Sequence, residues 1–437
     1  MGHLAGKDIF NKVGNKIDSL HVRCTNNDNL REIARALFTE EEAGVFVKLP
    51  YVFSTLERIH KITGLPEKHL EHMLNGLSGK GLVVDIWANG RYHYMPSPMI
   101  IGIFEFTMMR TGKDSRPDEW GPLFYRYLEN PDSIYNVNLG DGQFMSPARV
   151  LPNDESTLPD EYTRILDYES AASITERASL CAVGLCSCRH EKLHAGVKTC
   201  DLPLDTCASF GWAADYLIRH NMARKVSASE MKETLALSGK KGLVLCADNV
   251  RWNVTFICQC CSCCCNLLRG ITKHGYPNTV VTSSFIANVM SDNCNGCSKC
   301  EKACPVNAIT MLEDGSSSVP KTKKASVNED FCLGCGVCTL LCKTKCLTLK
   351  KRTSRFIHPE TTFERVILQC LERGTLQNQI FDNPESLTQT FMRGLIKGFL
   401  KLVPARQIEM SETLRSAFLA SARLIVRIQG KGWITEI

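Results

Sequence analysis

Apolar residues spaced by three and four predict helices near the start of the chain. One such pattern occupies residues 28–37. Thr39 and Glu42 have the spacing of a capping box, in which each side chain satisfies the backbone N–H of the other residue. This pair predicts a short helix that ends before Pro50.

Two further helices and a hairpin follow. Apolar stripes over 56–62 and 66–77 predict two helices that are joined by a tight turn. Strand-like runs over 82–87 and 91–95 flank an Asn-Gly dipeptide, which is the strongest short signal for a hairpin. Together these elements resemble a winged helix.

The charge of the second helix tests whether this region binds DNA. Between Pro66 and Lys80 the charges of Glu67, Lys68, Glu71 and Lys80 cancel. Without a basic face, the release of counterions from phosphates contributes little affinity. We therefore expect docking or packing here, and no nucleic acid as partner.

The patterns further along the chain are mixed. Residues 98–110 predict a mostly apolar helix, and residues 112–160, rich in Pro, Gly, Asp and Asn, predict an irregular connector. Amphipathic spacing predicts helices over 173–180 and 210–220, and a capping box opens another at Ser227. A small α/β scaffold is expected in this middle part.

The last part of the chain is again helical. Five apolar residues fall on one stripe with three basic residues beside them: Leu387, Phe391, Leu395, Phe399 and Leu402, with Arg393, Lys397 and Lys401. A second basic helix is expected over 411–428. Such a stripe most often packs on its own protein, but it also suits a partner or peripheral contact with an anionic membrane.

Composition narrows the class of protein. The chain has 437 residues, 44% of them apolar and 22% charged, which indicates a globular protein of several compact units. No run of about eighteen apolar residues predicts a membrane span, and no export signal is visible in residues 1–20. We therefore expect a cytoplasmic protein. Its net charge of +6 could favour acidic protein partners.

The unusual feature is the number of cysteines, 23 in all, of which 21 lie between Cys181 and Cys346. Clustered thiols in a reducing compartment favour metal binding over disulfides. Eight of them form two matching motifs, Cys294-x2-Cys297-x2-Cys300-x3-Cys304-Pro305 and Cys332-x2-Cys335-x2-Cys338-x3-Cys342. Three evenly spaced thiolates can wrap a cube of iron and sulfide, whereas zinc knuckles usually offer separated C-x2-C pairs.

These motifs resemble bacterial-type ferredoxins that carry two [4Fe-4S] clusters, over about residues 294–349. In that family the fourth cysteine of each run binds the other cluster. The resemblance therefore implies one cluster on Cys294, Cys297, Cys300 and Cys342, and a second on Cys332, Cys335, Cys338 and Cys304. The chain departs from the family in having Lys343 where a second proline is usual, a longer stretch over 311–330, and an additional thiol at Cys346.

Twelve further thiols precede these motifs, too many for packing alone: Cys181, Cys186, Cys188, Cys200, Cys207, Cys246, Cys258, Cys260, Cys261, Cys263, Cys264 and Cys265. We predict at least one additional iron–sulfur cluster there, because soft ligands at this density suit such clusters. The best candidate quartet is Cys186, Cys188, Cys200 and Cys207, and a second candidate group is Cys258, Cys260, Cys261, Cys263 and Cys264.

Two alternatives stay open for these upstream thiols. One is a structural zinc at the quartet, and the other is a set of redox-active thiols that pass through a disulfide. His190 and His194 are near enough to bind metal, although a hydrogen bond to a cluster sulfur, or solvation, is the more common role.

The whole layout resembles the 4Fe-4S dicluster-domain proteins of anaerobic bacteria and archaea, over about residues 40–350. We predict an α+β protein with five parts: a winged-helix-like domain (1–111), an irregular connector (112–160), a cysteine-rich domain (161–285), a two-cluster ferredoxin domain with βαβ units (286–352) and a helical tail (353–437). The resemblance implies low-potential electron transfer.

Motifs for nucleotide binding or acyl transfer are absent from the sequence. The simplest function is therefore an electron-transfer component that passes electrons between a donor and a partner oxidoreductase in anaerobic metabolism. One alternative is a reductase whose active centre lies among the upstream cysteines. Another is a redox-sensing regulator that binds DNA. No catalytic residue is predicted, and whether the chain is an enzyme on its own stays open.

Overall fold

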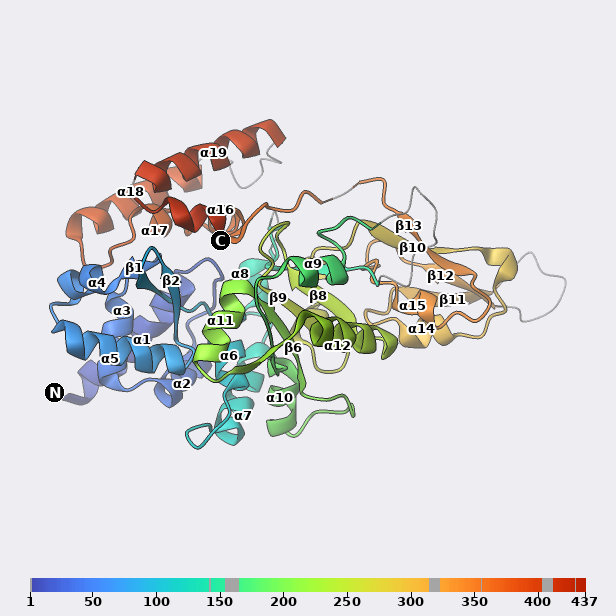
Figure 1. Ribbon diagram of the computed structural model, residues 1–437, viewed down its shortest axis with the longest axis horizontal. Helices are drawn as coiled ribbons and strands as arrows, with labels where there is room; N and C mark the ends of the chain where they lie inside the picture. The colour runs from blue at the N-terminus through green and yellow to red at the C-terminus, as the bar shows by residue number, and fades with distance from the viewer. Residues whose placement is uncertain are drawn as a thin grey trace.

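The computed structural model describes residues 2–140, 143–153, 165–313, 323–354, 356–402, 412–428 and 430–437. It is a mixture of helices and small sheets, consistent with the α+β class (Figure 1). Figure 1 shows the N-terminal and C-terminal helices at one end, a larger sheet in the middle and two short two-stranded sheets at the other end.

The N-terminal region contains the helices and hairpin that the sequence predicts. Its elements are α1 (Gly2–Asp18), α2 (Asp28–Leu37), α3 (Glu40–Lys48), β1 (Ser54–Thr55), α4 (Leu56–Thr63), α5 (Glu67–Gly79), β2 (Val83–Ala88) and β3 (Arg91–Pro96). The capping box is confirmed, because Glu42 N donates to Thr39 Oγ1 at 3.2 Å and Thr39 N donates to the Glu42 carboxylate at 2.9 Å. The strand order is β1-β3-β2. The winged-helix assignment itself stays a prediction.

Residues 98–110 do not form the single helix that was expected. A first turn over Met99–Ile103 contains Ile101 at φ 54°, and helix α6 (Phe104–Met109) begins only after it. The backbone N–H of Gly102 donates to the Glu105 carboxylate at 3.1 Å. The chain therefore bends around a buried carboxylate instead of continuing its own helical hydrogen bonds.

The expected irregular connector is largely structured. It holds helices α7 (Pro117–Leu128) and α8 (Tyr135–Asn138) and strand β4 (Ala148–Leu151). Trp120, Phe124 and Tyr127 recur on one face of α7 and are buried in the N-terminal core. Burial of these aromatic side chains outweighs the Pro and Gly content that predicted a loop. Residues 154–160 of the expected connector lie outside the described residues.

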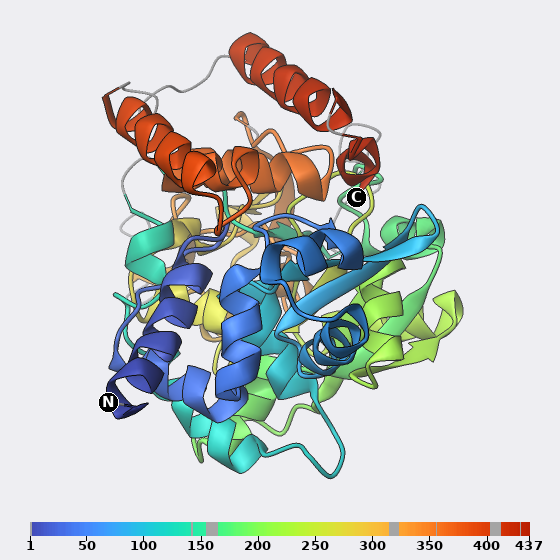
Figure 2. The same cartoon turned by 90° about the vertical axis from the view of Figure 1, so that its left-hand side faces the viewer.

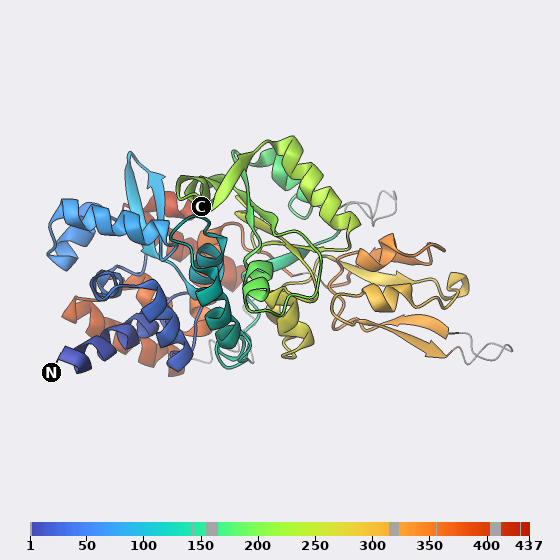
Figure 3. The ribbon, with the colours of Figure 1, turned by 90° about the horizontal axis from the view of Figure 1, so that it is seen from below.

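The middle of the molecule is a six-stranded antiparallel sheet of order β4-β8-β9-β6-β5-β7. Its further strands are β5 (Cys181–Leu185), β6 (Asp205–Phe210), β7 (Ala223–Val226), β8 (Val244–Asp248) and β9 (Phe256–Cys260). The helices of this part are α9 (Ala171–Arg177), α10 (Ser187–His194), α11 (Gly211–Arg219), α12 (Ala228–Lys240) and α13 (Asn266–Thr272). Seen from below, the sheet lies between the N-terminal helices and the hairpins (Figure 3).

The two hairpin-like pairs lie at the end opposite to the N-terminus. Strand β10 (Phe285–Val289) pairs with β13 (Leu347–Lys351), and β11 (Ile309–Glu313) pairs with β12 (Lys323–Val327). Helix α14 (Lys299–Ala303) precedes β11, and helix α15 (Val337–Leu340) precedes β13. Val244, Leu268 and Leu349 belong to one hydrophobic core, so this unit packs directly against the six-stranded sheet.

The C-terminal helices fold back over the N-terminal region (Figure 2). They are α16 (Thr362–Arg373), α17 (Leu376–Ile380), α18 (Leu387–Leu402) and α19 (Glu412–Ile428). The Arg58 guanidinium donates to both carboxylate oxygens of Asp382 at 2.6 and 2.7 Å, which fixes this return. Among the described residues, no helix is both long and apolar enough to cross a membrane.

The predicted apolar stripe of α18 is exposed where the structure describes it. Leu387, Phe391 and Leu395 have exposed fractions of 87%, 67% and 54%. These three side chains are therefore more than half exposed on the described protein, contrary to the commonest expectation for such a stripe. The side chains of Phe399, Lys401 and Leu402, like residue Ser411, lie outside the described residues.

Gly334 links the second cysteine motif to strand β10 and gives a test of this packing. It has φ +70°, and a Cβ atom there would overlap the carbonyl oxygen of Phe285. We expect Gly334→Ala to lower the free energy of unfolding by about 3 kcal/mol or more. The clash between the added Cβ and Phe285 adds to the strain of an alanine in the left-handed backbone conformation. Thermal unfolding of the variant and of the unchanged protein measures this loss of stability.

Gly64→Ala is the matched control for this change. Gly64 has the same φ of +70°, but nothing lies within 4 Å of an added Cβ. It should therefore show only the left-handed strain of about 1–2 kcal/mol. Equal losses in the two variants would contradict the close approach of Gly334 to β10.

Candidate metal centres

The two cysteine motifs form similar loops in front of short helices. Cys294 and Cys297 precede α14, and Cys332 and Cys335 precede α15. Gly296, Gly334 and Gly336 have φ of +70°, +70° and +80°, as expected for tight loops around a cofactor. The last cysteine of each motif, Cys304 or Cys342, follows the helix.

Two small cavities divide these thiols into mixed groups. The first, of about 80 Å³, is lined by Cys294, Cys297, Cys300, Cys342 and Cys346. The second, of about 20 Å³, is lined by Cys304, Cys332, Cys335 and Cys338. The fourth cysteine of each motif thus lies with the first three of the other motif, which is the grouping that the ferredoxin resemblance implies.

The two groups differ in their exposure to solvent. Cys297 of the first group is exposed, whereas Cys332 and Cys338 of the second are buried. Desolvation raises the pKa of the Cys335 thiol to about 12. Backbone N–H groups already point at two sulfurs of the second group, from Ala308 to Cys304 at 3.1 Å and from Ala287 to Cys332 at 3.5 Å. Such contacts tune a bound cluster.

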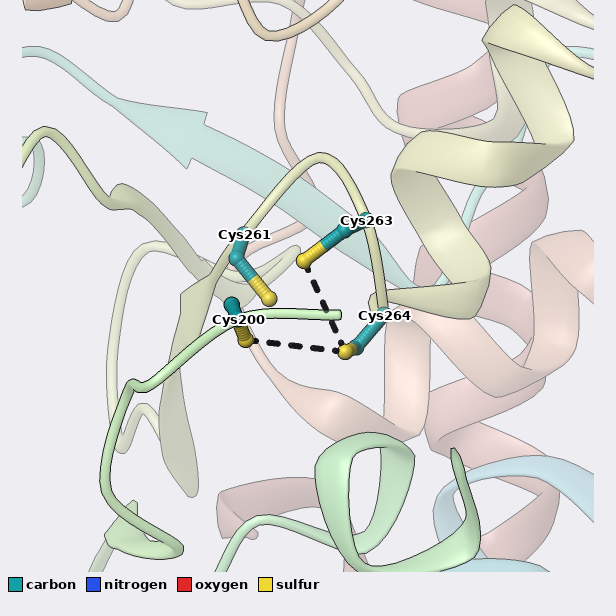
Figure 4. A group of neighbouring side chains, drawn as sticks. All are labelled: Cys200, Cys261, Cys263 and Cys264. Atoms are coloured by element: carbon teal, nitrogen blue, oxygen red, sulfur yellow. Dashed lines mark hydrogen bonds between the residues drawn. The ribbon is translucent and has the colours of Figure 1, made fainter. Parts of the chain in front are cut away.

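The structure divides the expected upstream quartet, because Cys186, Cys188 and Cys207 line one cavity and Cys200 does not. Cys200 lies instead with Cys261, Cys263 and Cys264, and the four sulfur atoms all lie within 4.8 Å of one another (Figure 4). The Cys264 sulfur is 3.8 Å from that of Cys200 and 3.6 Å from that of Cys263. Cys200 joins this group because the loop before β6 lies against the turn that follows β9.

Six of the remaining upstream thiols surround a cavity of about 250 Å³, called the large cavity below because it exceeds the two cavities at the cysteine motifs. Its walls are mostly apolar, and six thiols besides that of Cys261 line it: Cys186, Cys188, Cys207, Cys258, Cys260 and Cys265. They form a connected series, since Cys207 interacts with Cys258, Cys258 with Cys260, Cys260 with Cys265 and Cys265 with Cys188.

Burial keeps these cavity thiols protonated unless a cation is present. Desolvation raises the pKa of Cys186 well above that of an exposed thiol. The pKa of Cys260 is raised to about 12, mainly through its contact with Cys246. A carboxyl also lines the cavity, and desolvation raises the pKa of Glu105 to about 7.

Sequence reasoning missed two participants. Cys265 had no predicted role, although it ends the Cys-rich run directly before α13 and lines the cavity. Cys246 on β8 is fully buried and contacts Cys260. Cys246 on β8 pairs with Cys258 on β9, and this register brings Cys246 close to the thiols of β9. The spacing of cysteines along the chain does not reveal such a register.

His190 and His194 are engaged with each other rather than with thiols. The Nδ1 atom of His190 contacts the Met108 carbonyl at 2.6 Å, and the two Nε2 atoms lie 2.9 Å apart. His194 Nδ1 contacts Asp118 at 2.6 Å. These contacts use both ring nitrogens of each histidine, so neither is placed as a metal ligand.

Comparison with known proteins supports part of this assignment. A family model described as "4Fe-4S dicluster domain" matches residues 293–346. This match supports the conclusion that the chain is an iron–sulfur protein. No curated protein and no solved structure matches it. The match covers both cysteine motifs and reaches Cys346, and the upstream thiols lie outside it.

The additional thiol of Cys346 generates a prediction for this iron–sulfur protein. Its sulfur lies 3.4 Å from that of Cys342 and lines the same cavity. We expect Cys342→Ser to retain the iron of this cluster with altered EPR, because Cys346 can replace the lost ligand. Iron analysis of anaerobically purified protein measures retention.

The single and double variants separate the two thiols. Cys346→Ser alone should leave iron and EPR unchanged, whereas the double variant should lose about four irons, those of one cubane. Full loss of one cluster in Cys342→Ser alone would show that Cys346 cannot substitute.

Proposed function

We propose that this chain is a cytoplasmic multi-cluster iron–sulfur protein that passes low-potential electrons between a donor and a partner oxidoreductase in anaerobic metabolism. Two [4Fe-4S] clusters would be held by Cys294, Cys297, Cys300 and Cys342, and by Cys332, Cys335, Cys338 and Cys304. The crossed grouping of these eight thiols around two cavities carries the proposal.

The different exposure of the two sites supports a direction for this electron path. The first cluster site reaches solvent at Cys297, at the end of the molecule remote from the N-terminus, so a redox partner can approach it there. The second site faces inward, where Asn153 N donates to the Cys335 carbonyl at 3.0 Å. The Cys335 thiol is close enough to Cys246 to raise the pKa of the Cys246 thiol. Cys246 in turn contacts Cys260 at the large cavity.

A third iron–sulfur centre at the large cavity would extend this path. Its six thiols exceed the four ligands of a cubane, and a bound cation would stabilise the thiolate forms that burial disfavours. Electrons that enter at Cys297 would then pass two clusters before they reach the interior. The exposed stripe of α18 offers a separate surface for a partner or for peripheral contact with a membrane.

Metal analysis with EPR tests the proposal. The protein should contain about eight irons from two cubanes, and about twelve with the third centre. Cys297→Ser and Cys335→Ser should each perturb one cluster and remove the spin coupling between the two in the dithionite-reduced protein.

Cys370→Ser is the control for these substitutions. Cys370 is fully buried in α16, away from both motifs, and its replacement should leave iron and EPR unchanged. A protein that is colourless and free of iron after oxygen-free purification would refute the function.

A second candidate function is a reductase with its active centre at the large cavity. The enclosed apolar walls and the Glu105 carboxyl beside the thiols favour it, because a simple electron carrier needs no such space. An iron with an open coordination position would distinguish the two functions.

Cyanide is a suitable probe for such an iron. We expect cyanide added to the reduced protein to shift the EPR signal of the third centre and to leave the two ferredoxin-like clusters unchanged, since these have four cysteine ligands each. An unchanged signal from the third centre would indicate full thiolate ligation and favour the electron carrier.

A further inference from the structure

Cys200, Cys261, Cys263 and Cys264 form a thiol group of a different kind from the others. Among the described residues, they are the only set of three or more His, Cys, Asp or Glu side chains placed to hold a metal ion, with every ligand atom within 4.8 Å of the rest. Two of the sulfur pairs are 3.6 and 3.8 Å apart. Four thiolates that share one tetrahedral zinc, with Zn–S bonds of about 2.3 Å, have sulfurs about 3.8 Å apart.

A [4Fe-4S] cluster makes a different demand on its ligands. Each thiolate binds a separate iron, so the sulfurs are held apart by the inorganic cube. The ferredoxin-like thiols that the structure describes line cavities of about 80 and 20 Å³, and no three of them form a close group like that of Cys200. The same protein thus contains both geometries.

We propose that Cys200, Cys261, Cys263 and Cys264 bind one zinc ion as a tetrahedral tetrathiolate. The proposal does not depend on the electron-transfer function. Zinc is redox-inert, so this centre would be structural and would lie outside the electron path.

The backbone prepares this site from two segments. Three of the ligands come from one turn between β9 and α13, which is closed by a hydrogen bond from Cys265 N to the Cys261 carbonyl at 3.2 Å. The fourth, Cys200, comes from the loop before β6 (Figure 4). Leu202 and Leu243 pack on the group and shield it from water.

Arg189 joins the two segments, and its burial is an independent indication that the thiol group carries negative charge. Its guanidinium donates to the Pro203 carbonyl at 2.9 Å, to Thr206 Oγ1 at 2.6 Å and to the Gln259 carbonyl. Arg189 is fully buried, yet no ion pair with a carboxylate is found for it among the described residues. It interacts instead with the Cys261 thiol.

A buried cation without a counterion is unfavourable. Four thiolates around Zn²⁺ exceed its charge by two, and such an excess would compensate the guanidinium. The zinc would therefore fix the turn whose neighbours, Cys260 and Cys265, line the large cavity.

Zinc analysis and zinc K-edge EXAFS of the anaerobically purified full-length protein test this proposal. The expected result is one zinc per chain with four sulfur ligands at about 2.3 Å. This measurement needs no variant. Absence of zinc, a mononuclear iron in its place, or zinc bound by nitrogen or oxygen would overturn the proposal.

Two variants show which residues bind. Cys200→Ser and Cys263→Ser should lose the zinc or one of its sulfur ligands while iron content and the EPR of the ferredoxin-like clusters stay unchanged. Loss of about four irons in Cys200→Ser would instead reveal a cubane at this site and refute the zinc. Cys181→Ser, in a buried position on β5 outside every thiol group, should alter neither metal.

Discussion

The burial of thiols controls the chemistry of this molecule. A cysteine removed from water keeps its proton unless a cation stabilises the thiolate. Desolvation raises the pKa of Cys186 and Cys335 in two separate parts of the chain. The structure nevertheless collects these thiols in the interior, where packing alone would favour side chains without reactive sulfur. Metal binding would resolve this conflict, because a metal replaces the protons and links segments that are distant in sequence.

The hydrophobic core is continuous between the two parts of the molecule that hold the proposed metal centres. The core that holds the ferredoxin-like unit also contains β8 and α13 of the middle sheet. Cys246 lies fully buried in that shared core, between the inner cysteine motif and the large cavity. A rigid packed contact keeps the distance between centres constant, whereas a flexible linker would not. An electron that enters at the exposed Cys297 could reach the interior only if the distance to the buried thiols is kept constant in this way.

Local rules predicted the parts of the structure that depend on neighbouring residues. The capping box of Thr39 and Glu42 is set by adjacent residues. The crossed grouping of the two cysteine motifs was implied by a family resemblance, and the thiols that line the two small cavities are grouped in the same way. Long-range contacts determined the rest. Cys200 joins Cys264 rather than Cys186 because Arg189 holds the loop before β6 against β9, and the helical spacing of Trp120 and Phe124 was hidden among Pro and Gly.

The spacing between sulfur atoms is a better guide to the bound metal than cysteine spacing along the chain. The run from Cys258 to Cys265 looks like one motif in the sequence, yet its thiols divide between a close group and a cavity wall. Strand β9 ends at Cys260, so the residues before that point follow the strand and those after it follow a turn. The strand places Cys258 and Cys260 on the cavity wall and the turn places Cys263 and Cys264 in the close group, whereas Cys261 belongs to both and Cys265 returns to the cavity wall. The close group suits one ion, and the cavity thiols suit a larger inorganic core, so the two sites can select different metals from the same kind of ligand.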